Sequence, residues 1–250
     1  MSEIPDSLEA AIAQAKTATL NALEAGCPRL QVELVLPEIA LEAQRLAREF
    51  ADLFADYGSG LRLIFPDTGA AALARRDWGE VPFQVGDLGS RLTPIESKLS
   101  DDDQLLLLVS PSAIEVERVE KLCKLAGDRP VILLTPQLES VATVGIGYAA
   151  RQLRDRFLST LETAYYLRPF EGGALTRRFP QPWQVWLETE DEGYQLLAEE
   201  ATKPVGDRLE RLLTGATETA AADSESDGKA KPKKPGFLAS MQQFLRALSQ

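Results

Sequence analysis

Prolines at the ends of apolar segments constrain the fold of this chain more than any other feature. Four expected strands finish in proline, at Leu36-Pro37, Phe65-Pro66, Ser110-Pro111 and Thr135-Pro136. Proline cannot donate a hydrogen bond to a sheet ladder, so it belongs where a strand stops and the chain turns toward a helix. Strands that alternate with helices favour a mainly parallel sheet with helices on both faces. The pattern therefore predicts a three-layer α/β fold.

Apolar spacing predicts where the elements of this fold lie. We expect strands at residues 29–36, 61–65, 83–88, 104–109 and 131–134, and helices at 6–26, 38–57, 69–76 and 112–126. Asp6 is the expected N-cap of the first helix, with Glu9 three residues further on. Another helix begins at Ile146, and its inner apolar face continues as far as Ala164.

The C-terminal part of the domain contains short expected strands separated by turn residues. The strands cover residues 163–170, 174–179, 183–188 and 194–199, and glycine or proline lies in each turn between them. This arrangement indicates an antiparallel meander, with a short helix at 207–213 after it. Residues 1–214 are therefore expected to form a single α/β domain that includes the meander at 163–200.

The last 36 residues have a different character. Residues 215–235 lack apolar periodicity and are expected to be a disordered linker, whereas residues 236–250 are expected to form an amphipathic helix. At about 22 Å this helix is too short to span a bilayer, so it would lie on a membrane or in a partner's groove, or dock on its own domain. The predicted contact residues are Lys231, Lys233, Lys234, Phe237, Leu238, Met241, Phe244, Leu245 and Leu248.

Composition excludes several classes of function. The chain has no histidine, which removes Ser-His-Asp and Cys-His catalysis and every histidine-based metal site. A net charge of −11 argues against a general nucleic-acid binder, which needs a basic surface to capture phosphates. The acidic run Asp101-Asp102-Asp103 lacks the ligand spacing of a calcium loop and is expected to be a solvated loop. We expect no cofactor and no metal.

A segment rich in arginine and aromatic residues, from Gly145 to Trp186, is the strongest candidate for a binding surface. Eight of the seventeen aromatic residues lie in it, with six arginines against three acidic residues. Arginine and aromatic side chains are enriched at interfaces, although the same composition fits a packed helix and meander. The residues predicted to bind a protein partner are Arg151, Arg154, Arg168, Arg177, Arg178, Trp183 and Trp186.

An alternative is an enzyme that binds a nucleotide or another phosphate ligand where the parallel strands end. Gly145-Ile146-Gly147 lies between an expected strand and a helix, but the third glycine of a dinucleotide motif is replaced by Ala150. Ligands bind at the carboxyl ends of strands in open α/β sheets, and the same residues also serve as helix caps. The polar residues at these ends are Glu38, Asp67, Thr68, Ser110, Ser112, Thr135 and Gln137.

Long strings of residues between Ile4 and Leu213 carry a family resemblance. They include RLQVELVLPEI, IFPDTGAAALARRDW, GIGYAARQLRDRFLSTLETAYYLRPF and RRFPQPWQVW. These strings are similar to an uncharacterised-domain family of cyanobacteria and plastids. Its plant members include a low-photosystem-II-accumulation assembly factor, and a related domain is fused to a plastid adenylate kinase. The family supplies no agreed catalytic residues.

The resemblance implies a non-enzymatic auxiliary factor. Its expected partners are protein clients, with photosystem II subunits foremost, and its expected location is the cytoplasm at the periphery of the thylakoid membrane. The residues add a physical picture to this expectation. An acidic α/β body would present an arginine-aromatic surface to a client, and the C-terminal helix would hold the protein near the membrane.

Overall fold

The computed structural model describes residues 4–90, 92–138, 148–189, 191 and 193–214. These residues form a nine-stranded sheet in the order β3-β2-β4-β5-β1-β6-β7-β8-β9. Strands β1 to β6 pair in parallel, and β6 to β9 pair in antiparallel fashion. The strands are β1 (Arg29–Leu34), β2 (Leu61–Phe65), β3 (Gln84–Asp87), β4 (Leu105–Val109), β5 (Val131–Leu134), β6 (Glu162–Phe170), β7 (Gly173–Arg178), β8 (Trp183–Glu188) and β9 (Tyr194–Glu200).

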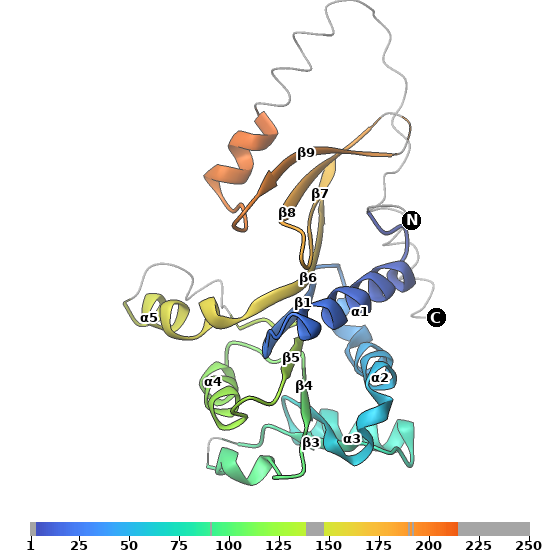
Figure 1. Ribbon diagram of the computed structural model, residues 1–250, viewed down its shortest axis with the longest axis vertical. Helices are drawn as coiled ribbons and strands as arrows, with labels where there is room; N and C mark the ends of the chain where they lie inside the picture. The colour runs from blue at the N-terminus through green and yellow to red at the C-terminus, as the bar shows by residue number, and fades with distance from the viewer. Residues whose placement is uncertain (1–3, 91, 139–147, 190, 192, 215–250) are drawn as a thin grey trace, which may run out of the picture.

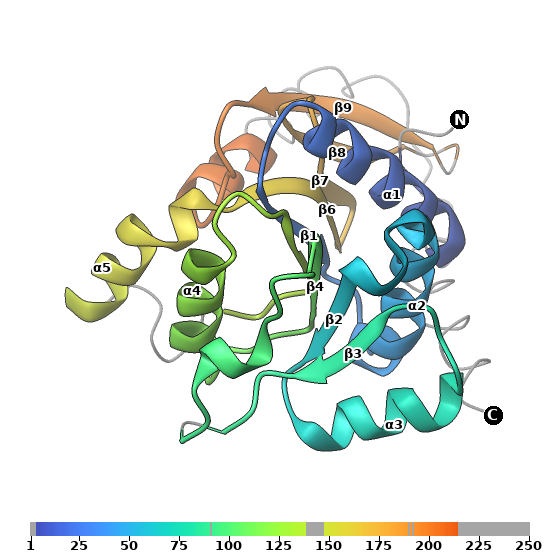
Figure 2. The same ribbon diagram turned by 60° about the horizontal axis from the view of Figure 1, so that its bottom comes forward.

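Helices lie on both faces of the sheet, as the proline-bounded strands predict. They are α1 (Leu8–Glu24), α2 (Ala43–Leu53), α3 (Thr68–Trp78), α4 (Val116–Leu125) and α5 (Tyr148–Arg156), with 3₁₀ turns η1 (Ile39–Glu42), η2 (Ala55–Gly60), η3 (Ile95–Lys98) and η4 (Leu158–Thr160). A last helix spans residues 207–214. Helices α1, α2 and α3 cover what we call the first face, and α4 and α5 lie on the second face (Figures 1 and 2).

The apolar pattern of each strand follows from its place between these layers. Every residue of β4 and β5 is buried, because helices cover both faces there. In β1, Leu30, Val32 and Leu34 pack under α1 and α2 on the first face. The alternate residues Gln31 and Glu33 face the other way, so a central strand carries polar side chains on the second face.

The antiparallel part of the sheet extends away from the parallel part (Figure 1). On its second face, Leu209, Leu212 and Leu213 of the 207–214 helix pack against a cluster that includes Tyr166 and Trp183. On the first face, Ile4, Ala174 and Trp186 form a small cluster of their own. The meander is therefore packed on both faces, and the predicted mainly parallel sheet with a C-terminal antiparallel meander is confirmed.

The structure corrects the helix that was predicted to continue to Ala164. Helix α5 ends at Arg156, a 3₁₀ turn follows, and Ala164 lies within β6. Phe157 and Leu161 are both buried in the core of the second face, but the turn η4 rather than a continued helix brings them there. The helical spacing of apolar residues thus predicted correctly that Phe157 and Leu161 are buried, although it predicted the wrong backbone conformation for them.

Other boundaries differ from the prediction too, and β1 ends at Leu34 rather than at residue 36. Ser7, rather than Asp6, is the N-cap of α1, and its side chain accepts a hydrogen bond from the amide of Ala10. The helix expected at 38–57 is divided into η1, α2 and η2. The helix expected from residue 112 begins at Val116, after a turn in which the Glu115 carboxylate accepts a hydrogen bond from the amide of Ser112.

Candidate binding surface

Charged and aromatic side chains form a row across four neighbouring strands on the second face. Glu33 of β1 is opposite Tyr166 of β6, Tyr166 is opposite Arg177 of β7, and Arg177 is opposite Trp183 of β8. Lys203, from the segment after β9, lies over this row. We call these five residues the cross-sheet row.

Lys203 contacts the row through both charge and aromatic rings. Its ammonium nitrogen is 3.9 Å from the ring centre of Tyr166, 5.4 Å from that of Trp183, and 3.6 Å from a carboxylate oxygen of Glu33. The two rings meet edge to face, with their centres 5.0 Å apart. A cation enclosed by two aromatic faces and a carboxylate is stabilised by the ring quadrupoles and by ion pairing together. Burial, and to a lesser extent Glu33, raises the pKa of Tyr166 to about 12, so this phenol stays neutral.

Arg177 lies deeper in the row than the sequence suggests. Its guanidinium is 5.5 Å from the ring centre of Trp183 and donates a hydrogen bond of 2.5 Å to Glu162. Its side chain is 19% exposed, and its Nε is buried without a hydrogen-bond partner in the described residues. A buried donor without an acceptor costs stability. The contacts with Glu162 and Trp183 nevertheless keep Arg177 mostly inside the fold, so it offers little surface to a partner.

Both tryptophans predicted to contact a partner are core residues. Trp183 is 4% exposed and Trp186 is 6% exposed. The indole N–H of Trp186 donates a hydrogen bond to the Thr176 hydroxyl on the first face. Neither ring presents an exposed aromatic surface, because the 207–214 helix packs against Trp183 and Ile4 packs against Trp186.

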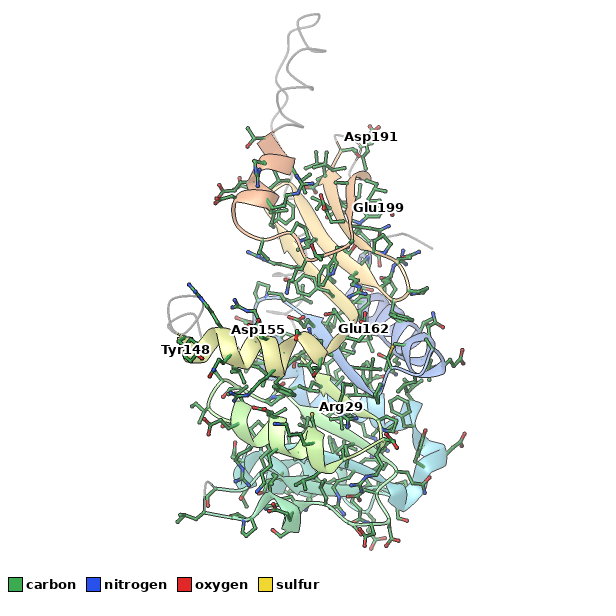
Figure 3. All side chains as sticks on the ribbon, turned by 60° about the vertical axis from the view of Figure 1, so that its left-hand side comes forward. Arg29, Tyr148, Asp155, Glu162, Asp191 and Glu199 are labelled. Carbon is green, nitrogen blue, oxygen red and sulfur yellow. The ribbon has the colours of Figure 1, made fainter. Side chains whose placement is uncertain are left out.

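Helix α5 is an exposed part of the arginine-aromatic segment. Tyr148, at the start of this helix, is 78% exposed, and Arg151 and Arg154 are exposed too. The helix packs on the second face through Leu153 and the residue that follows its end, Phe157. In Figure 3, α5 crosses the front of the molecule, with the labelled Tyr148 at its outer end and Glu162 where β6 begins. It therefore combines a packed side with an outer side on which two arginines outnumber one exposed carboxylate, that of Asp155.

An ion-pair cluster ties α5 to the body. Arg156 donates to both carboxylate oxygens of Glu120 on α4, at 3.0–3.2 Å, and Lys124 donates to the same carboxylate at 2.7 Å. Glu120 is 5% exposed. The hydrogen bonds from Arg156 hold the pKa of Glu120 below its usual range despite this burial, with Lys124 acting in the same direction.

The predicted partner-binding residues thus fall into separate places. Arg177 and Trp183 meet in the cross-sheet row, and Arg151 and Arg154 lie on α5. Arg178 is half-buried and is opposite Tyr165, and Arg168 is exposed on β6. The nine residues predicted in the C-terminal linker and helix lie outside the described part of the chain.

Sequence reasoning did not single out three residues of the row, Glu33, Tyr166 and Lys203. A signal for Glu33 was present, because residues 29–36 alternate between apolar and polar side chains. The alternation does not reveal that this strand is central, with its polar side near the meander. Lys203 carried no signal, since only the turn after β9 brings it back over the sheet.

The carboxyl edge of the parallel strands is the site of the alternative prediction. Ser110 and Thr135, just after β4 and β5, lie close together, with their hydroxyl oxygens 2.6 Å apart. Both have left-handed backbones, with φ of 46° and 43°, which is strained for a non-glycine residue. Ser112 and Gln137 continue the pairing beyond them. The structure therefore brings four of the seven predicted edge residues together.

The other edge residues serve local structure or lie apart. The Asp67 carboxylate caps α3, whose first residue is Thr68, by accepting from the amide of Ala70. Glu38 is exposed and has a φ of 59°. Because Asp67 and Glu115 occupy the turns that open α3 and α4, a phosphate would meet negative charge there. Gly145-Ile146-Gly147 lies outside the described residues.

Comparison with known families places the chain in one of them. The model of a family described as a domain of unknown function, DUF1995, matches residues 5–211. The chain belongs to this family. The matched range contains β1 to β9 and therefore the whole cross-sheet row and α5. Within the described residues, none of the helices combines the length and apolar character needed to cross a membrane, and no cluster of three or more Cys, Asp or Glu side chains could hold a metal ion.

Proposed function

We propose that this member of the DUF1995 family is a non-enzymatic auxiliary factor that binds an acidic segment of a protein partner through α5. The observation that carries the proposal is the cationic outer side of α5, with Tyr148, Arg151 and Arg154 exposed on a chain of net charge −11. Guanidinium groups pair with carboxylates through parallel hydrogen bonds, and a neighbouring tyrosine adds rigid contact area. An acidic body that repels acidic partners elsewhere would direct them to this helix.

The ionisation of three side chains argues against a catalytic role for these particular groups. Hydrogen bonds from Arg156 lower the pKa of Glu120, and a hydrogen bond from Lys121 lowers that of Glu96. Burial raises the pKa of the Cys123 thiol to about 12. Carboxylates held ionised and a thiol held neutral are poorly matched to proton transfer or nucleophilic attack near neutral pH.

We further propose that the partner belongs to photosystem II biogenesis at the thylakoid membrane, with the C-terminal helix as the peripheral membrane contact. Support comes from the resemblance to a family with an assembly factor among its plant members and from the lysine cluster before residues 236–250. Removing residues 215–250 should abolish co-sedimentation with thylakoid membranes. If a strain that lacks this protein accumulates photosystem II normally, the proposed role in photosystem II biogenesis is refuted.

The binding proposal is tested by affinity capture from solubilised membranes. We expect Arg151→Ala/Arg154→Ala to lose most of the protein captured by the intact chain, and the loss to be largest at low salt. The matched control is Arg76→Ala/Lys121→Ala, which makes the same change in net charge at exposed positions on α3 and α4. Equal capture by the two double variants would refute α5 as the binding surface.

A second candidate, a small-ligand site at the carboxyl edge, is favoured by the left-handed backbones of Ser110 and Thr135. Strained backbone of this kind concentrates at functional sites. Thermal unfolding in the presence of nucleotides and sugar phosphates tests it, because a ligand that binds only the folded state raises its stability. An unchanged midpoint at millimolar ligand would refute this candidate.

A further inference from the structure

The guanidinium of Arg156, at the end of α5, is held along one of its edges. Its Nε donates to both carboxylate oxygens of Glu120, at 3.0 and 3.2 Å, and its Nη2 donates to one of them at 3.0 Å. A guanidinium has five N–H donors in a planar fork, so the edge formed by Nη1 and Nη2 keeps donors that Glu120 does not use. Within the described residues, all hydrogen bonds of this guanidinium go to Glu120, and the Arg156 side chain is 50% exposed. The unused edge fits one carboxylate through two parallel hydrogen bonds.

Glu120 fixes the orientation of this guanidinium. The Glu120 side chain is 7% exposed on α4, and its carboxylate also accepts a hydrogen bond from Lys124 at 2.7 Å. Because a buried carboxylate that loses a cation is left poorly compensated, the pair with Arg156 stays formed. An arginine that is already oriented loses little conformational freedom when it binds a ligand. Arg151 is exposed on the same helix and makes no hydrogen bond or ion pair within the described residues, so binding has to order its side chain.

The charges around Arg156 favour an anion at its unused edge. Arg156 and Lys124 carry two positive charges against the single negative charge of Glu120, and the Lys124 side chain is 70% exposed. Glu117, one turn before Glu120 on α4, also acts electrostatically on Arg156. Because Glu117 is exposed, water and salt screen its charge. A partner carboxylate is therefore attracted by the cluster and opposed weakly by Glu117.

We propose that Arg156 is the anchor of the α5 surface, with its Nη1–Nη2 edge binding an aspartate or glutamate carboxylate of the partner and with Glu120 as the positioning residue. This inference rests on the proposed binding of an acidic segment through α5. It adds a residue that composition did not single out, because the contact that orients Arg156 is created by the packing of α5 beside α4. Arg151 and Arg154 add attraction around this fixed contact.

Fluorescence anisotropy with the full-length chain and a labelled octaglutamate peptide tests the proposal. At about 0.1 M salt the screening length is about 10 Å, so the peptide responds mainly to charges near its contact. We expect Arg156→Lys to raise the Kd by about fivefold or more, since lysine keeps the charge and loses the planar fork. Arg151→Lys is the matched control on the same helix and should change the Kd by less than about twofold, because Arg151 has no fixed orientation to lose.

Two changes on α4 separate positioning from simple charge. Glu117→Gln and Glu120→Gln each remove one negative charge, so charge alone predicts that both tighten the binding of an acidic peptide. We expect Glu117→Gln to lower the Kd, and Glu120→Gln to raise it by about threefold or more, because Arg156 then loses the carboxylate that orients it. Thermal unfolding shows whether each variant is folded at the assay temperature. If Glu120→Gln is not, the comparison of Arg156→Lys with Arg151→Lys decides alone.

Two outcomes would overturn the proposal and leave α5 as the binding surface. One is an equal rise in Kd for Arg156→Lys and Arg151→Lys, and the other is tighter binding by both glutamine variants. A different outcome bears on the proposed function itself. If the parent chain binds octaglutamate no better than octaglutamine, the binding of an acidic segment is refuted, and the role of Arg156 is refuted with it.

Discussion

Replacing Arg177 by methionine tests whether charge or packing holds the cross-sheet row together. Methionine keeps an apolar stem and removes the guanidinium, so the ion pair with Glu162 and the contact with the Trp183 ring are lost. Glu162 is 34% exposed, so screening by water limits the ion pair to about 1 kcal/mol. The cation–π contact adds about 0.5–1 kcal/mol. Removing the buried, unpartnered Nε offsets part of this loss, for a net destabilisation of about 1 kcal/mol.

Urea unfolding, followed by tryptophan fluorescence, measures this change. In a double-mutant cycle with Glu162→Gln, we expect a coupling energy of about 0.5–1 kcal/mol between the two positions. The net destabilisation of about 1 kcal/mol by Arg177→Met should lower the thermal midpoint by about 2–4 °C for a domain of this size. Arg76→Met is the control, because Arg76 is 73% exposed on α3. Two results would refute this reasoning. One is that the changes in unfolding free energy caused by Arg177→Met and Glu162→Gln simply add in the double variant, and the other is that Arg177→Met destabilises the protein no more than Arg76→Met does.

Three other predictions concern single residues. Arg156 lowers the pKa of Glu120, so the stability that this pair confers is present above pH 4.5 and is lost as pH falls below it. The difference in unfolding free energy between the parent and Glu120→Gln should therefore shrink as the pH is lowered from 4.5, and a constant difference would contradict this. Glu38→Gly should raise the free energy of unfolding, measured in urea, by about 0.5–1 kcal/mol, because Glu38 is exposed and has a left-handed φ of 59°. Glu38→Ala should not raise it, because alanine has the same steric penalty at this φ. A thiol reagent should modify Cys27 in the native chain and both cysteines after denaturation, because Cys123 is buried; rapid native reaction of both would refute this.

Local sequence signals predicted the parallel half of the sheet closely. Strand β3 is shorter by one residue at each end than predicted, and β1 ends two residues before the predicted end. Strands β2 and β5 have the predicted boundaries, and β4 differs by one residue. The reason is physical, since a short run of apolar residues followed by proline has few other stable conformations. The segment before β6 was predicted less well. Phe157 and Leu161 have helical spacing, yet the chain leaves the helix at Arg156 because pairing with β1 requires an extended backbone from Glu162.

The candidate site was predictable only in part. Composition directed attention to Arg177 and Trp183, and these residues are in contact, but both lie inside the fold. Exposure could not be read from the sequence, because a meander residue is buried or exposed according to what packs on its face. The same uncertainty applied to α5 and β6, on which Arg151, Arg154 and Arg168 proved to be exposed.

Within this protein, the sequence alone determined the α/β class, the succession of strands and helices along the chain, and the position of an arginine-aromatic segment. These features depend on residues close together in the chain, through apolar spacing, turns and the missing N–H of proline. Only the tertiary structure decided that Glu33 and Lys203 meet over Tyr166. Their contact depends on strand order, because β1 lies beside β6 and the chain returns across the meander after β9. No local pattern specifies the order of the strands within the sheet, since that order follows from the packing of the whole sheet.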